Sequence, residues 1–151
     1  MFKQTDKAFP SDINHFGCLF ISTLYILEQH FGASWPTQQD VLNTYNSEEN
    51  DEDLGKECFV NDSDKLIASI IGAGKIKILH DVGPDYICGD GEYEIQTWYN
   101  AASKFTHFVV GDGKGKERAN VEFDPIQQPD GSGSYTVARG VCTDKRVLKA
   151  L

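Results

Sequence analysis

The sequence predicts an α+β fold in which an N-terminal helical half packs on a C-terminal antiparallel β-sheet. Before Gly74, apolar stretches are bounded by helix-capping residues and by glycines that end helices. After Gly74, polar and apolar residues alternate in short runs that Gly-rich turns separate. Helices first and strands later is the order typical of an α+β domain. The chain has 151 residues without an internal repeat or linker, so we expect a single domain over residues 1–151.

Two helices are expected in the first third of the chain. Residues 16–31 are apolar on nearly all sides, which is typical of a helix buried in the middle of a domain, and Gly32 provides its end. Thr37 and Asp40 have the spacing of a capping box, in which each side chain bonds the backbone of the other. A second helix should therefore begin after Thr37, with its apolar stripe within residues 41–45.

An acidic segment and a third helix follow. Residues 47–57 hold six acidic residues and one lysine, which predicts a solvated loop. The spacing lacks the central glycine and distal glutamate of a calcium-binding loop, so we expect no metal there. Several capping residues within 61–64 predict a short third helix, which Gly72 closes.

The second half of the chain predicts strands. They are expected at residues 75–79, 93–99, 107–111, 119–123 and 135–141, with Gly-rich hairpin loops at 111–115 and 129–133.

Composition excludes several functional classes. A formal net charge of −9 argues against nucleic-acid binding, which depends on Lys and Arg to neutralise phosphates. The four cysteines form no CxxC pair, so we expect neither a metal nor another cofactor. The N-terminus has no apolar secretory signal, and the longest apolar stretch is too short to span a bilayer. We therefore expect a cytoplasmic protein with reduced thiols that does not bind membranes; the sequence does not indicate its oligomeric state.

Three residues have the chemistry of a nucleophile, a base and an orienting group. Cys18 opens the long apolar helix, whose positive end favours a thiolate. His107 begins a later strand, and Asp124 lies 17 residues further on, so one hairpin would place the two side by side. Each residue also has a structural interpretation: a buried core cysteine, a histidine that bonds the backbone, and an Asp-Pro turn. The joint arrangement favours the catalytic interpretation.

The motifs around these residues resemble the papain-like cysteine peptidases, and in particular the C39-like peptidases that cut double-glycine leaders in bacteriocin exporters. The matching elements are Gly-Cys at 17–18, His-Phe-Val-Val at 107–110 and Asp-Pro at 124–125. The resemblance implies a papain-like fold. It also implies that Cys18 is the nucleophile, that His107 is the general base and acid, and that Asp124 orients His107.

One element of that family is missing. The family usually has a glutamine six residues before the cysteine to bind the oxyanion, and here this position is Asp12, whose carboxylate repels negative charge. Asn14 or Gln4, assisted by the backbone N–H of Cys18, is the expected substitute.

The leading hypothesis is a cysteine hydrolase that cleaves an amide bond in a peptide, protein or peptidoglycan through an acyl-enzyme intermediate. Asp12 motivates an alternative: an inactive papain-like fold that acts as a binding or inhibitory module, of the kind encoded by phages and mobile elements. His15 is a less favoured base, and Trp98 is close enough in the chain to line a groove. The remaining histidines and cysteines are expected to be structural: His30, His80, Cys58, Cys88 and Cys142.

Overall fold

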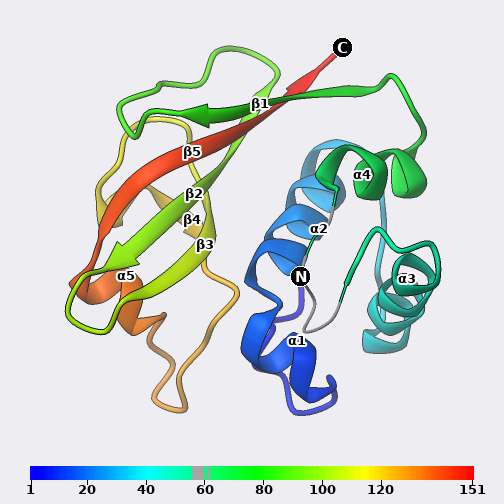
Figure 1. Cartoon of the computed structure of the whole chain (residues 1–151), viewed down its shortest axis with the longest axis horizontal. Helices are drawn as coiled ribbons and strands as arrows, with labels where there is room; N and C mark the ends of the chain where they lie inside the picture. The colour runs from blue at the N-terminus through cyan, green and yellow to red at the C-terminus, as the bar shows by residue number, and fades with distance from the viewer. Residues whose placement is uncertain (56–59, 61) are drawn as a thin grey trace.

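The computed structural model of the chain describes residues 1–55, 60 and 62–151. The elements, in chain order, are α1 (Ser11–Phe16), α2 (Cys18–His30), α3 (Gln38–Asn50), α4 (Ser63–Ile71), β1 (Ile76–Val82), β2 (Glu92–Asn100), β3 (Phe105–Gly111), the 3-10 helix η2 (Arg118–Asn120), β4 (Val121–Phe123), α5 (Tyr135–Arg139) and β5 (Val141–Ala150). Figure 1 shows α1 to α4 on one side of the molecule and the sheet on the other, with α2 between the sheet and α3. The α+β class predicted from the sequence is confirmed.

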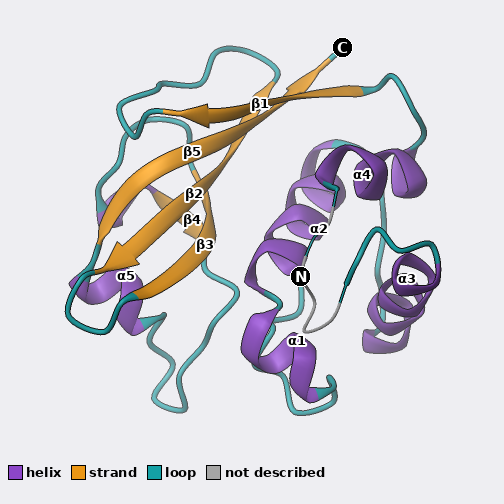
Figure 2. Ribbon diagram, viewed as in Figure 1, coloured by secondary structure: helices purple, strands orange, loops and turns teal. Residues whose placement is uncertain are grey.

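The five strands form one antiparallel sheet in the order β1-β5-β2-β3-β4. The last strand, β5, is therefore an internal strand that pairs with both β1 and β2. The hairpin β3–β4 pairs Val110 with Phe123, which confirms that a single hairpin connects the His107 strand to the Asp124 turn. Figure 2 shows α5 at one end of the sheet, where β2 ends and β3 and β5 begin, apart from the other helices.

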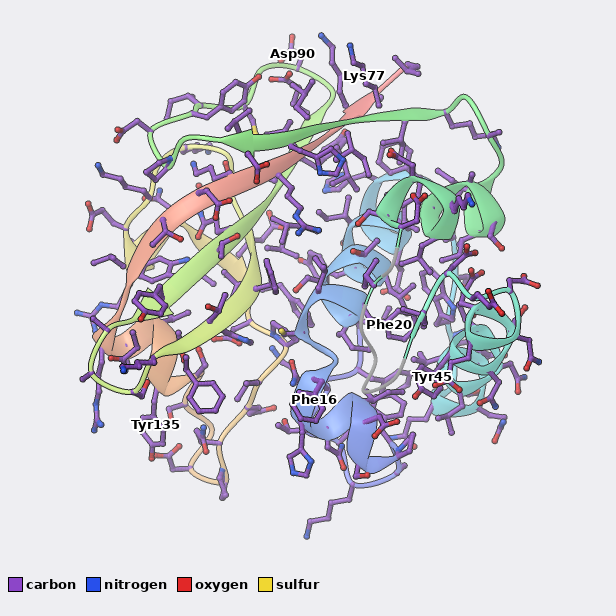
Figure 3. All side chains as sticks on the ribbon, viewed as in Figure 1. Phe16, Phe20, Tyr45, Lys77, Asp90 and Tyr135 are labelled. Carbon is purple, nitrogen blue, oxygen red and sulfur yellow. The ribbon has the colours of Figure 1, made fainter. Side chains whose placement is uncertain are left out.

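Helix α2 is the centre of the hydrophobic core. Its residues Phe20, Ile21, Leu24 and Leu27 have no exposed surface, which is why this segment is apolar on nearly all sides. They share one cluster with side chains of the outer helices and of the sheet, such as Ile95, Val110 and Leu148. Figure 3 shows Phe20 facing Tyr45 of α3, with ring centroids 6.0 Å apart. The sheet and the helical half are thus held together through α2.

The predicted helix ends are largely confirmed. Thr37 and Asp40 form the capping box, with the Asp40 N–H donating to Thr37 Oγ1 at 3.2 Å and the Thr37 N–H donating to Asp40 Oδ2 at 2.9 Å. Helix α4 begins after Asp62, whose side chain accepts from the Lys65 N–H, and it ends before Gly72, which has a φ of +98°. Helix α1 was not predicted.

The predicted strand at 135–141 is wrong. Residues Tyr135–Arg139 form α5, because the Ser134 side chain caps a helical turn by accepting from the Val137 N–H at 3.2 Å. The strand of this region, β5, begins only at Val141 and continues through residues for which no strand was predicted. A five-residue helix is too short to give a periodic pattern that differs from that of a strand.

The prediction of a solvated acidic loop is also wrong over most of its length. Helix α3 continues to Asn50, and Glu48 and Asp53 are only 3% and 7% exposed. Leu54 is buried too. Lys56, Glu57 and Cys58 lie outside the described residues.

The polar N-terminal segment packs against the loop that follows β4. Gln4 is fully buried, and its backbone N–H donates to the Pro125 carbonyl at 2.9 Å. Thr5 exchanges hydrogen bonds with the Gln127 backbone. In the part of the chain that the structure describes, no helix has the length and apolarity needed to cross a membrane.

Candidate active site at the start of α2

Cys18 is the first residue of α2, and the glycine before it is sterically required. Gly17 separates α1 from α2, and a Cβ atom at this position would lie 2.6 Å from the Ile13 carbonyl oxygen. The chain can therefore turn from α1 into α2 only with glycine here. Cys18 itself is half-buried, so that solvent can reach it. As at the start of any helix, the backbone N–H groups of the first turn of α2 have no partner within the helix.

His107 lies on β3, where it is only 3% exposed. Its Nε2 atom is 2.7 Å from Asp124 Oδ1, and Cys18 is close enough to the same imidazole to raise its pKa. Since Nε2 is engaged by Asp124, Nδ1 is the ring nitrogen left for Cys18. Burial lowers the pKa of His107, but the hydrogen bonds and charges of Asp124 and Cys18 outweigh it and raise the pKa to about 9. The imidazole is therefore protonated at neutral pH.

Asp124 is held in place by the turn that follows β4. Its Oδ1 also accepts from the Ile126 N–H at 2.9 Å, and its Oδ2 accepts from the Ser134 N–H at 3.0 Å. Burial raises the pKa of Asp124, yet the hydrogen bond and charge of His107 and the two backbone N–H groups lower it below its ordinary value. A carboxylate with both oxygens bonded has a fixed orientation, and it fixes that of His107 in turn.

The N-terminal segment completes the support of this turn. The Lys3 ammonium donates to the Asp124 carbonyl oxygen at 2.6 Å and lies 4.2 Å from the centre of the Phe123 ring. Burial lowers the pKa of Lys3, and the charge of Asp124 partly opposes this shift. Sequence reasoning missed Lys3 and Ser134. Ser134 has the residue type of a helix cap, whereas no sequence signal distinguishes Lys3 from a surface lysine.

Asn14 and Gln4, which were expected to bind the oxyanion, donate hydrogen bonds to each other's backbone carbonyl oxygens. The Asn14 amide donates to the carbonyl oxygens of Gln4 and Asp6, at 2.7 and 2.9 Å. The Gln4 amide donates to the Asn14 carbonyl at 3.2 Å, while Gln4 Oε1 is buried without a hydrogen-bond partner. The Asp12 carboxylate accepts from the Tyr45 hydroxyl of α3 at 3.3 Å. Both amide hydrogens of Asn14 are therefore already engaged.

The other histidines and cysteines considered from the sequence are placed as follows. His15 is exposed and has an edge contact with Phe16, His30 stacks on Tyr93, and His80 is an exposed residue 4.0 Å from Asp64. Cys88 Sγ lies 3.6 Å from Glu94 Oε1, and Cys142 is buried. Trp98 is opposite His107 in the β2–β3 register but is only 2% exposed, and its Nε1 donates to Gln96.

Comparison with known proteins assigns the chain to a family. Residues 1–149 match the family described as "Protein of unknown function, DUF261". The chain belongs to the DUF261 family. No curated protein and no solved structure matches it. Because the DUF261 match covers nearly the whole chain, the residues around Cys18, His107 and Asp124 all lie within the family region.

Proposed function

We propose that this DUF261 protein is a cysteine hydrolase that cleaves a peptide or amide bond. Cys18 acts as the nucleophile, His107 as the general base and acid, and Asp124 as the group that orients His107. The observation that carries the proposal is the buried imidazole of His107, which bonds Asp124 through Nε2 and is close enough to Cys18 for that residue to raise its pKa. A structural histidine needs neither a thiol partner nor a carboxylate with both oxygens fixed.

In the proposed reaction, the proton of the Cys18 thiol is already on His107 Nδ1, and the thiolate sulfur attacks the substrate carbonyl carbon. As the C–N bond breaks, the imidazolium returns the proton to the leaving amine, and a thioester to Cys18 remains. Water, deprotonated by His107, then hydrolyses the thioester and releases the acid. An imidazole with a pKa of about 9 stays protonated at neutral pH, so that it can give its proton to the leaving amine.

A papain-like arrangement is part of the proposal. It is supported by the chain order of the three residues and by their positions on the start of α2, on β3 and after β4. In such an arrangement the nucleophile comes from the helical half and the base from the sheet. Substrate would bind between them.

Three exposed aromatic side chains lie close in sequence to residues of the site, which favours a peptide substrate with apolar side chains. Phe16, Phe105 and Tyr135 are 49%, 66% and 56% exposed. Phe16 lies two residues before Cys18, Phe105 lies two residues before His107, and Tyr135 follows the serine that binds Asp124. Figure 3 labels Phe16 at the end of α1 and Tyr135 at the start of α5. Large exposed aromatic groups are typical of binding surfaces.

An acyl-transfer experiment tests the proposal. The protein is mixed with the p-nitrophenyl ester of N-acetylphenylalanine, release of nitrophenol is followed in time, and acylated peptides are identified by mass spectrometry. We expect acylation of Cys18 in wild type and in the control variant Cys88→Ala, and no burst in Cys18→Ala. His107→Ala should acylate much more slowly. Wild-type protein without an adduct on Cys18, or an unchanged burst in Cys18→Ala, would refute the proposal.

The hydrogen bonds of Asn14 favour a second candidate function. Since both hydrogens of its amide are engaged by backbone carbonyls, the oxyanion would depend on backbone N–H groups at the start of α2 or on Gln4. With weak oxyanion stabilisation the same site would bind a peptide without turnover, as a binding or inhibitory module. The acyl-transfer experiment separates the two functions, because a binding module would give no more than a single stoichiometric burst.

A further inference from the structure

Three carboxylates meet where α3 ends, far along the chain from Cys18. Glu48 lies in the last turns of α3, Asp51 is the residue that caps its C-terminus, and Asp53 follows in the next turn. One carboxylate oxygen from each residue lies within 4.8 Å of those of the other two. The C-terminus of a helix carries negative partial charge, so anionic groups are unfavourable at this end. Among the residues that the structure describes, none of the three forms an ion pair with Lys, Arg or His.

One buried oxygen atom of Glu48 lacks a hydrogen-bond partner. The residue is only 3% exposed, and its Oε2 atom is buried without a hydrogen-bond partner, although the side chains of Asp53 and Ser69 interact with the same carboxyl group through hydrogen bonds. Buried polar atoms without a partner are rare in folded proteins, because each costs free energy of desolvation. A bound cation would give this oxygen the partner that it lacks.

The position of Glu48 also gives a ligand access. Glu48 lines a pocket of about 410 Å³ between α3 and α4, together with Ser47, Ser69 and Trp35. A small ion can therefore reach Glu48 through this pocket, and Asp51 is itself exposed to solvent.

We propose that Glu48, Asp51 and Asp53 bind a divalent cation, and that this cation is Ca²⁺. All three ligands are carboxylate oxygens, which are preferred by hard cations and not by soft metals. Oxygens bound at about 2.4 Å from Ca²⁺ lie at most about 4.8 Å from each other, and the three carboxylate oxygens lie within this limit. Mg²⁺, at about 2.1 Å, requires a tighter octahedral arrangement, whereas Ca²⁺ accepts irregular geometry with waters in the remaining positions. This site is independent of the chemistry proposed for Cys18.

Calorimetric titration tests the site. CaCl₂ and, separately, MgCl₂ are titrated into the whole chain, to ~10 mM free ion, a concentration above the dissociation constants of weak natural calcium sites. Three variants are compared: Asp51→Asn, Glu48→Gln, and Glu49→Gln, which removes a charge from the same helix outside the cluster. We expect saturable Ca²⁺ binding with one ion per chain, at least about tenfold weaker in Asp51→Asn and Glu48→Gln, and unchanged in Glu49→Gln. Mg²⁺ should bind more weakly than Ca²⁺.

Thermal unfolding provides a second measurement. Ca²⁺ that binds the folded state should raise the unfolding midpoint of wild type and of Glu49→Gln, but not that of Asp51→Asn. Asp51 is exposed, so its replacement should leave the fold intact, which circular dichroism checks. The proposal is wrong if Ca²⁺ gives neither binding heat nor a thermal shift in wild type, or if Asp51→Asn binds Ca²⁺ as tightly as Glu49→Gln.

Discussion

Replacement of His107 by glutamine should destabilise the protein by an amount that depends on pH. The pKa of His107 is raised to about 9 in the folded protein, against an ordinary value of 6.5. The difference, 9 − 6.5, is 2.5 pH units, which at about 1.36 kcal/mol per unit corresponds to ~3 kcal/mol. The folded protein binds this proton more tightly than the unfolded chain. The contribution of His107 to the free energy of unfolding is therefore complete below about pH 6.5, and it is lost as the pH rises through about 9.

Urea unfolding of wild type and His107→Gln between about pH 5.5 and pH 10 measures this contribution. The quantity compared is the difference between the free energies of unfolding of the two proteins. The contributions of groups that do not interact with His107 cancel in this difference. We expect this difference to shrink by ~3 kcal/mol across the range. His80→Gln, which removes an exposed histidine, serves as the matched control and should show a much smaller dependence. A difference for His107→Gln that is constant, or that grows with pH, would refute the assignment of a protonated imidazole held by Asp124 and Cys18.

Three other substitutions test the fold and the site. Gly17→Ala should lower the free energy of unfolding by ~1–3 kcal/mol in urea titrations and slow the alkylation of Cys18, because the new Cβ meets the Ile13 carbonyl; an unchanged stability and rate would contradict the steric argument. Lys145→Ala should cost ~3–5 kcal/mol in the same assay, because it leaves the fully buried Glu94 carboxylate without its cation at 3.0 Å. A loss below about 1 kcal/mol would mean that water replaces the ammonium. Thr37→Ala should cost ~1 kcal/mol through loss of the α3 cap, and a neutral effect would show that the capping box adds nothing.

The sequence predicts the helical half better than the sheet. The capping box at Thr37, the cap before α4 and the end at Gly72 were predictable, because each depends on side chains only a few residues apart. The last strand was not, because Ser134 starts a helix too short to show a period and β5 depends on pairing with strands far along the chain. The burial of Glu48 was also hidden, since an acidic run by composition alone indicates solvent exposure.

The candidate site was also predictable from the sequence only in part. The hairpin that brings His107 to Asp124 was predictable from their spacing and the Gly-rich turn between them. The contact of Lys3 with the Asp124 carbonyl joins residues 121 positions apart and depends on the tertiary fold. The same holds for Asn14, whose amide the sequence predicts to be a free donor and the structure shows bonded to the backbone of the N-terminal segment.

The most direct test of the account is the rate at which iodoacetamide alkylates each cysteine between about pH 5 and pH 9, in wild type and in His107→Ala. An ordinary free thiol ionises near ~8.5. Burial raises the pKa of Cys88 to about 12 and that of Cys142 to about 11, so these two thiols should react slowly throughout and serve as internal controls. The account predicts fast alkylation of Cys18 already at about pH 6, and loss of this reactivity in His107→Ala. Alkylation of Cys18 as slow as that of Cys142 at every pH, or equally fast without His107, would contradict it.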